Sequence, residues 1–207
     1  MKMKLALCTF ALFAVLNTAN AQDSGIAFFG GATQIFPTGG LGNYFTPATA
    51  ANAGMALRLG ERFCADIMGT FAATSRLNKP LLRSETGYNR DFQKGDRFIY
   101  TELVLLVGYA LIGNRYSRFA LTPFVNTGAT WIESRDNNDE NDDRFHVANA
   151  FTVGAGLRTD FLIFQGVNLR LDIGYNIPVR FNYTPARGNV FYVRTSIALW
   201  TSADRAF

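Results

Sequence analysis

Residues 167–181 read VNLRLDIGYNIPVRF, and every second residue of this stretch is apolar or aromatic. The positions in between carry Arg170, Asp172 and Arg180 together with asparagine, glycine and proline. A period of two predicts a β-strand with one apolar face and one polar face. The stretch is longer than the roughly 5–6 residues that are usual in soluble sheets, and a soluble apolar core could not hold its charges. A strand with lipid outside and a polar lumen inside accommodates both faces.

Seven further stretches show the same alternation, so the sequence predicts eight strands. They are expected at residues 25–36, 51–59, 63–76, 97–111, 119–134, 145–161, 167–181 and 189–201. Short connections alternate with long ones, as in bacterial outer-membrane barrels, where the short turns face the periplasm. We therefore predict an all-β fold, an eight-stranded antiparallel transmembrane up-and-down β-barrel with both termini in the periplasm.

Three local features depart from regular strand alternation. The first strand has no clear parity, and we assign Gln34 to the lumen because its side chain is polar. Pro123 and Pro178 each remove a ladder hydrogen bond, so we expect a bulge or a strand end at each. The glycines of residues 39–42 lie in a predicted outer loop, where they indicate flexibility.

The first 21 residues have the pattern of a secretory signal peptide. Lys2 and Lys4 precede an apolar run, and residues 19–21 read Ala-Asn-Ala, with small residues at the cleavage positions. We expect a single mature domain that begins at Gln22 and ends at Phe207. Loss of the two lysines would leave 18 basic residues against 16 acidic ones. This near balance does not favour a nucleic-acid partner.

The polar faces of the predicted strands collect charges of both signs. A buried charge without a partner is costly, so we expect these side chains to form ion pairs. An eight-stranded barrel is only wide enough for side chains to fill. We therefore expect an occluded lumen crossed by salt bridges, with a narrow or gated pore as the alternative. The predicted lumen network consists of Arg58, Asp66, Glu102, Arg158, Asp160, Arg170, Asp172, Arg180 and Arg194.

His146 is the only histidine, and it lies at the predicted outer end of the sixth strand. It could pair with Asp142 or Asp143 and with a serine such as Ser134 in an acyl-transfer site. Lipid A deacylase barrels, which are similar to this chain in size, use a histidine followed two residues later by serine. Ala148 occupies that position here. The sequence therefore favours a non-enzymatic barrel without catalytic residues, and a lipid A-modifying hydrolase is the alternative.

The acidic loop at residues 136–143 could bind a hard divalent cation, because it is rich in carboxylate and amide oxygens. It lacks the glycine and the final glutamate of an EF-hand loop, so a solvated loop is the simpler interpretation. No cofactor is expected. The candidate metal ligands are Asp136, Asp139, Glu140, Asp142 and Asp143.

On these features the chain resembles the small outer-membrane β-barrels of Gram-negative bacteria, the OmpA/OmpX-like and porin-like barrels. The resemblance rests on the signal peptide, the eight strands and the terminal Phe207. Members often end in a strand whose final Phe is read by the barrel-insertion machinery.

The resemblance implies a location in the cell outer membrane, in contact with outer-membrane lipid and lipopolysaccharide. It also implies a structural role or the binding of a protein partner through the outer loops. A subunit of a surface secretion or assembly complex, a lipid-modifying enzyme and a narrow pore are the alternatives.

Overall fold

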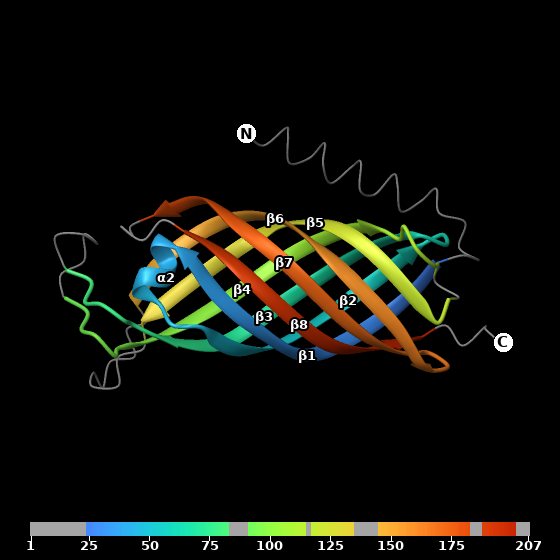
Figure 1. The fold of residues 1–207 in the computed structure, drawn as a ribbon, viewed down its shortest axis with the longest axis horizontal. Coiled ribbons are helices and arrows are strands. Elements are labelled where there is room, and N and C mark those ends of the chain that lie inside the picture. Colours follow the sequence, from blue (N-terminus) through green and yellow to red (C-terminus); the bar gives the residue numbers. More distant parts are fainter. Residues whose placement is uncertain (1–23, 83–90, 115–116, 135–144, 183–187, 202–207) are drawn as a thin grey trace.

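A computed structural model describes residues 24–82, 91–114, 117–134, 145–182 and 188–201. In this part of the chain, eight antiparallel strands form a closed barrel in which β1 pairs with β8 (Figure 1). The predicted up-and-down architecture is confirmed. The strands are β1 (Ser24–Gly39), β2 (Ala48–Leu59), β3 (Phe63–Arg76), β4 (Arg97–Tyr109), β5 (Phe119–Ser134), β6 (Phe145–Phe164), β7 (Val167–Asn182) and β8 (Gly188–Trp200).

The strand boundaries follow the sequence alternation closely. The predicted strands at residues 63–76 and 119–134 coincide with β3 and β5, and the others agree to within about three residues at each end. Strand β1 continues beyond its last regular apolar position because Gly39 still pairs with Gly188 of β8. Closure of the barrel therefore extends strands past the point where the apolar pattern ends.

The two ends of the barrel differ in the length of their connections. At one end, residues 60–62 join β2 to β3 and residues 165–166 join β6 to β7. Gly60 and Gly166 adopt positive φ values of 66° and 76° in these turns, a conformation that suits glycine. The other end carries the helix α2 (Gly40–Tyr44) and the β3–β4 connection, residues 77–96 (Figure 1). None of the described helices is long and apolar enough to cross a membrane.

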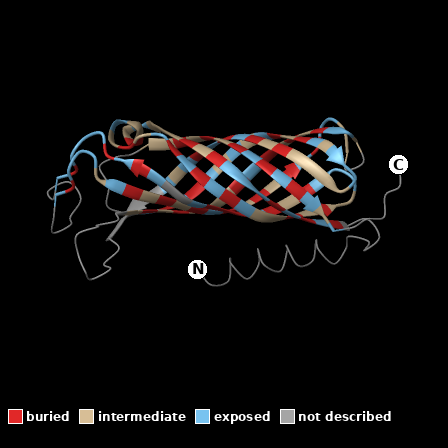
Figure 2. Cartoon of the chain, turned by 90° about the horizontal axis from the view of Figure 1, so that it is seen from below, coloured by how far each residue is buried: buried red, intermediate tan, exposed pale blue. Residues whose placement is uncertain are grey.

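Buried and exposed residues alternate along the strands, which gives the barrel wall a chequered pattern (Figure 2). In β4, Glu102 is 2% exposed whereas its neighbour Leu103 is 50% exposed. The outer surface is apolar and the lumen holds the polar residues, as the alternation predicts.

The assignment of Gln34 to the lumen was wrong. Its neighbours Thr33 and Ile35 are buried, and Gln34 lies on the outer surface. There its side-chain carbonyl accepts a hydrogen bond of 2.6 Å from the hydroxyl of Thr49, its partner residue on β2. This cross-strand bond satisfies a polar group that would otherwise be costly to expose to lipid.

A β-bulge lies at Pro178, as predicted. Thr152 pairs with Pro178, but the preceding Phe151 pairs with Arg180, so β7 contains one extra residue. The bulge shifts the pairing register between β6 and β7. Arg180, which the sequence alternation assigns to the lumen, follows the bulge, and its side chain lies outside the described residues.

Pro123 has no bulge, contrary to one of the two expectations for it. The register between β5 and β6 runs through Pro123 without a shift. On the other side of β5, pairing with β4 ends at Gly108 and Phe124, one residue before Pro123. Pro123 thus lies beyond the end of one of its two ladders, where a missing N–H is tolerated.

The glycines of residues 39–42 do not form a flexible loop, contrary to the sequence expectation. Gly39, with φ of 62°, turns the chain into the short helix α2. Leu41 of this helix is 2% exposed, and its carbonyl accepts a 2.9 Å hydrogen bond from the N–H of Phe45. Burial of the apolar side chain outweighs the low helix propensity of the glycines.

Arginine introduced at two exposed positions tests which part of the outer surface lies in the hydrocarbon core of the membrane. Leu103→Arg lies near the middle of the exposed β4 row, where we expect a loss of about 2–4 kcal/mol in the free energy of unfolding. Leu111→Arg lies just past the short-turn end of β4, where the same change should cost no more than about 1 kcal/mol. Urea unfolding in lipid vesicles measures both, and equal losses would contradict the assignment.

Candidate functional site: the charge network of the lumen

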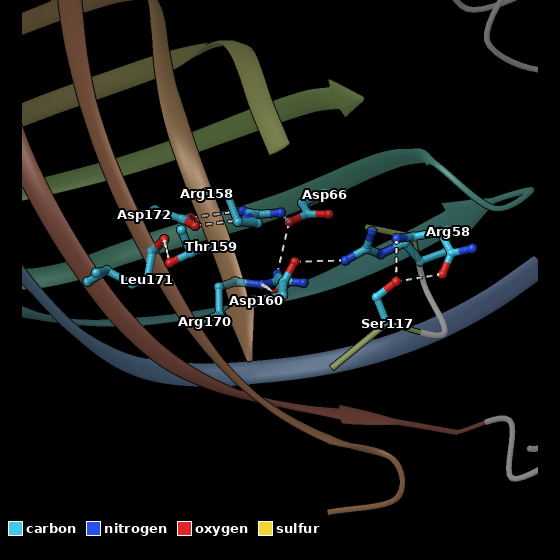
Figure 3. A network of polar contacts seen from close by, with 10 residues as sticks. Arg58, Asp66, Ser117, Arg158, Thr159, Asp160, Arg170, Leu171 and Asp172 are labelled. Atoms are coloured by element: carbon cyan, nitrogen blue, oxygen red, sulfur yellow. Dashed lines mark hydrogen bonds and ion pairs between the residues drawn. The ribbon is translucent and has the colours of Figure 1, made fainter. Parts of the chain in front are cut away.

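The lumen contains four arginines and four carboxylates among the buried residues that the structure describes. Part of this lumen network is drawn in Figure 3. Its positive and negative charges balance, and each residue is at most 2% exposed. The members are Arg58, Asp66, Glu102, Arg158, Asp160, Arg170, Asp172 and Arg194.

The centre of the lumen network is a bidentate ion pair between neighbouring strands. Arg158 of β6 and Asp172 of β7 are direct cross-strand partners. The Nε and Nη2 atoms of Arg158 donate hydrogen bonds of 2.7 and 2.8 Å to the two carboxylate oxygens of Asp172. This planar, two-point geometry is specific to arginine and explains why the lumen cations are arginines and not lysines.

Asp66 extends the lumen network to the opposite wall. Its Oδ2 atom accepts hydrogen bonds from Arg158 and, at 3.0 Å, from Nη1 of Arg170. Asp66 lies on β3 and Arg170 on β7, four strands apart in a barrel of eight. A side-chain contact between such strands crosses the full width of the lumen (Figure 3).

Asp160 makes a second link of the same kind. It accepts a 3.0 Å hydrogen bond from Nε of Arg170, its cross-strand partner on β7. It also accepts a 2.8 Å bond from Nη2 of Arg58 on β2, four strands away. Positive and negative groups therefore alternate in one continuous chain from Asp172 to Arg58.

A separate layer contains Arg194 and Glu102. Nη2 of Arg194 on β8 donates a 2.6 Å hydrogen bond to Glu102 on β4, again on the opposite wall. The other oxygen of Glu102 accepts bonds from the hydroxyl of Tyr100 at 3.1 Å and from the amide of Asn176 at 2.5 Å. The carboxylate is therefore fully engaged, as a buried charge requires.

Each of the four arginines also stacks on an aromatic ring. The contacts join Arg58 to Trp200, Arg158 to Phe124, Arg170 to Phe29 and Arg194 to Tyr192, with distances to the ring centroid of 5.4, 5.7, 4.8 and 3.7 Å. Such cation–π contacts stabilise a desolvated guanidinium. Glycine makes room for these rings, because a Cβ on Gly174 would overlap the hydroxyl of Tyr192.

An apolar cluster fills the end of the barrel that carries the long connections. Leu41 and Phe45 enter it from the β1–β2 connection, and Leu81 and Phe92 from the β3–β4 connection. The ring of Phe98 on β4 forms edge contacts with both Phe45 and Phe92, at centroid distances of 5.4 Å. Leu41, Phe45 and Phe98 also line a cavity of about 20 Å³, which has room for about one water molecule.

The lumen network brings together eight of the nine predicted charged residues, all except Arg180, whose side chain is outside the described part. Sequence reasoning missed the hydrogen-bonding roles of Asn176 and Tyr100. Both lie on the polar faces of their strands, and this parity is the signal that could have found them. The pairing of opposite walls has no signal in the sequence.

The residues considered for catalysis are described only in part. The backbone register pairs His146 with Glu133 and Ser134 with Phe145. Asp142 and Asp143 lie outside the described residues.

The candidate metal ligands Asp136, Asp139, Glu140, Asp142 and Asp143 also lie outside the described residues. In the described part, no group of three or more potential ligands is arranged to hold a metal ion.

Comparison with known proteins finds solved structures with the same fold but no protein related in sequence. No protein-family model matches the chain, and no curated protein sequence matches it. Three similar solved structures are Neisserial surface protein A, OprG from Pseudomonas aeruginosa and a major outer membrane protein from Thermus thermophilus. The fold is that of the small outer-membrane β-barrels.

The three likenesses cover most of each molecule. The TM-scores are 0.61, 0.59 and 0.56, and the sequence identities are 9%, 9% and 12%. The alignments cover 84%, 86% and 86% of this chain and 96%, 96% and 98% of the other chains. At such identities the likeness concerns the outer-membrane barrel fold alone, and function has to be argued from this chain's own residues.

The energetic coupling of the lumen network can be measured with a double-mutant cycle. Arg158→Met should lower the free energy of unfolding by about 3–5 kcal/mol, because it leaves the buried Asp172 without its arginine. Adding Asp172→Leu removes that unpaired charge and should restore much of the loss, while Asp66 keeps its bond to Arg170. Urea unfolding in vesicles gives both values. A double variant no more stable than Arg158→Met would contradict the pairing.

Proposed function

We propose that this protein is a non-conducting outer-membrane barrel that anchors a binding surface, formed by its long connections, at the outside of the cell. The observation that carries the proposal is the lumen network, whose ion pairs join opposite walls of the barrel at two depths. A transport function would require these pairs to separate, and separating a buried ion pair is costly.

The apolar cluster supports the same proposal. Leu41, Phe45 and Phe92 are each at most 3% exposed and close the lumen beyond the lumen network. An ion that entered from this side would first have to cross an apolar layer and then a charged one. The two layers oppose different classes of solute, because the apolar layer excludes ions and the charged layer excludes apolar molecules.

The lengths of the connections support an orientation. In outer-membrane barrels the short turns face the periplasm and the long loops face the outside. On that basis the turns at residues 60–62 and 165–166 are periplasmic, together with both termini. The helix α2 and the β3–β4 connection then form the outer rim.

The lumen network is not suited to an enzymatic role. Its carboxylates and arginines neutralise one another, and none is more than 2% exposed. A general acid or base must reach its substrate within hydrogen-bond distance. Binding at the rim is therefore a better use of this architecture than chemistry in the lumen.

Planar-bilayer recording tests the occlusion. The refolded protein should give no steady conductance above that of protein-free membrane, because both layers close the lumen. The double variant Arg194→Ala, Glu102→Ala should also be silent, since the chain from Asp172 to Arg58 still crosses the barrel. Large, stable openings of the unaltered protein would establish the narrow pore instead.

Surface labelling of intact cells tests the orientation. Asn78→Cys introduces an exposed thiol in the β3–β4 connection, and Glu61→Cys introduces one in the β2–β3 turn. A membrane-impermeant maleimide should label the first and leave the second unlabelled until the outer membrane is opened. The native Cys64 is fully buried, so the unaltered protein gives the background level of labelling. The reverse pattern would refute the proposed orientation.

A further inference from the structure

Two arginines of the strands differ from those of the lumen network. Arg76 ends β3 and Arg97 begins β4, and both are exposed on the outer surface. The four lumen arginines all have carboxylate partners, whereas neither Arg76 nor Arg97 forms an ion pair with another described residue. The two are direct cross-strand partners in the register of β3 and β4.

Like charges that face each other across two strands are destabilising. The chain repeats this arrangement further out. Lys79 and Lys94 are exposed and lie on facing segments of the connection, between the Leu77–Asp96 hydrogen bond and the Leu81–Phe92 bridge. Behind them the buried Leu77, Leu81 and Phe92 fix the backbone. We call Arg76, Lys79, Lys94 and Arg97 the rim cations.

The acidic residues of the same segment do not cancel the rim cations. Asp91 and Asp96 are the carboxylates in the described part of the connection, so two negative charges stand against four positive ones. The carboxylate of Asp96 accepts a 2.8 Å hydrogen bond from the backbone N–H of Gln93. Among the described residues of segment 76–97, positive charges therefore outnumber negative ones, which suits an anionic ligand.

The depth of Arg97 identifies the source of the anion. On β4 the outward row runs from Tyr109 to Ile99 and is apolar except for Thr101. At about 3.3 Å per residue and a tilt of about 40°, this row rises about 25 Å, the height of the apolar band of outer-membrane barrels. Arg97, two residues further, lies just beyond the hydrocarbon and on the face that points toward lipid.

We infer that Arg76 and Arg97 bind the phosphate groups of the outer-leaflet glycolipid, lipopolysaccharide, with Lys79 and Lys94 above them. The inference rests on the orientation given under the proposed function. Guanidinium groups bind phosphate in a bidentate manner, and two of them on directly opposed residues can hold the same phosphate. The bound anion removes the repulsion between the two arginines.

The test compares two double variants of the full chain. Arg76→Gln, Arg97→Gln removes the pair, and Arg62→Gln, Arg118→Gln removes two exposed arginines at the opposite rim. Each protein is refolded in zwitterionic detergent and titrated with bisphosphorylated lipid A or with its dephosphorylated form. Native mass spectrometry counts the bound lipid, and the heat-modifiable gel shift confirms folding.

We expect the first variant to bind phosphorylated lipid A at least tenfold more weakly than the unaltered protein, since two charge-assisted contacts are lost. Dephosphorylated lipid A should bind the unaltered protein equally weakly. The opposite-rim variant should match the unaltered protein to within about twofold. Phosphorylated lipid A should also raise the urea midpoint of the unaltered protein but not that of the first variant.

Two results would overturn the inference. One is equal binding of phosphorylated lipid A by both double variants. The other is binding of a soluble sulfated polysaccharide, lost in the first variant, without any preference for phosphorylated lipid A. Either result leaves the proposed function standing if the thiol introduced by Asn78→Cys is labelled from outside the cell, so the two failures are distinguishable.

Discussion

The structure depends on charge neutralisation inside a cylinder too narrow to hold water between all of its side chains. An eight-stranded barrel forces inward side chains from opposite walls into contact. Asp66 on β3 meets Arg170 on β7, and Glu102 on β4 meets Arg194 on β8. Since none of these groups can retreat to solvent, each must be matched by an opposite charge, and the lumen of the described chain is electrically neutral.

Charge neutralisation also explains the composition of the remaining lumen. Arginine supplies several donors in one plane, so one side chain can serve two carboxylates, as Arg158 serves Asp66 and Asp172. Rings cover the faces of the guanidinium groups, and glycines such as Gly174 open the space that those rings occupy. Beyond the last charged residues, the apolar cluster fills the lumen. A charged layer and an apolar layer therefore follow each other along the barrel axis.

The strands and most lumen residues were predictable because they depend on local alternation. The limits of β3 and β5, and the opposite faces of Glu102 and Leu103, follow from a period of two. Two errors have non-local causes. Gln34 is satisfied by Thr49 of another strand, and Leu41 is buried by a tertiary cluster. The choice of partner across the lumen depends on closure, which no single strand encodes.

The contacts across the lumen have a consequence for assembly. Arg58 and Asp160 are 102 residues apart in the sequence, and Arg194 and Glu102 are 92 residues apart. A partly formed sheet can form the ion pairs between β6 and β7, but it leaves Arg58, Glu102 and Arg194 without partners and exposed to hydrocarbon. Such an intermediate cannot rest in the membrane at low energy, so insertion and closure have to proceed as a single cooperative event. The ion pairs between opposite walls act as a checkpoint on folding, because only the closed ring of eight strands satisfies them.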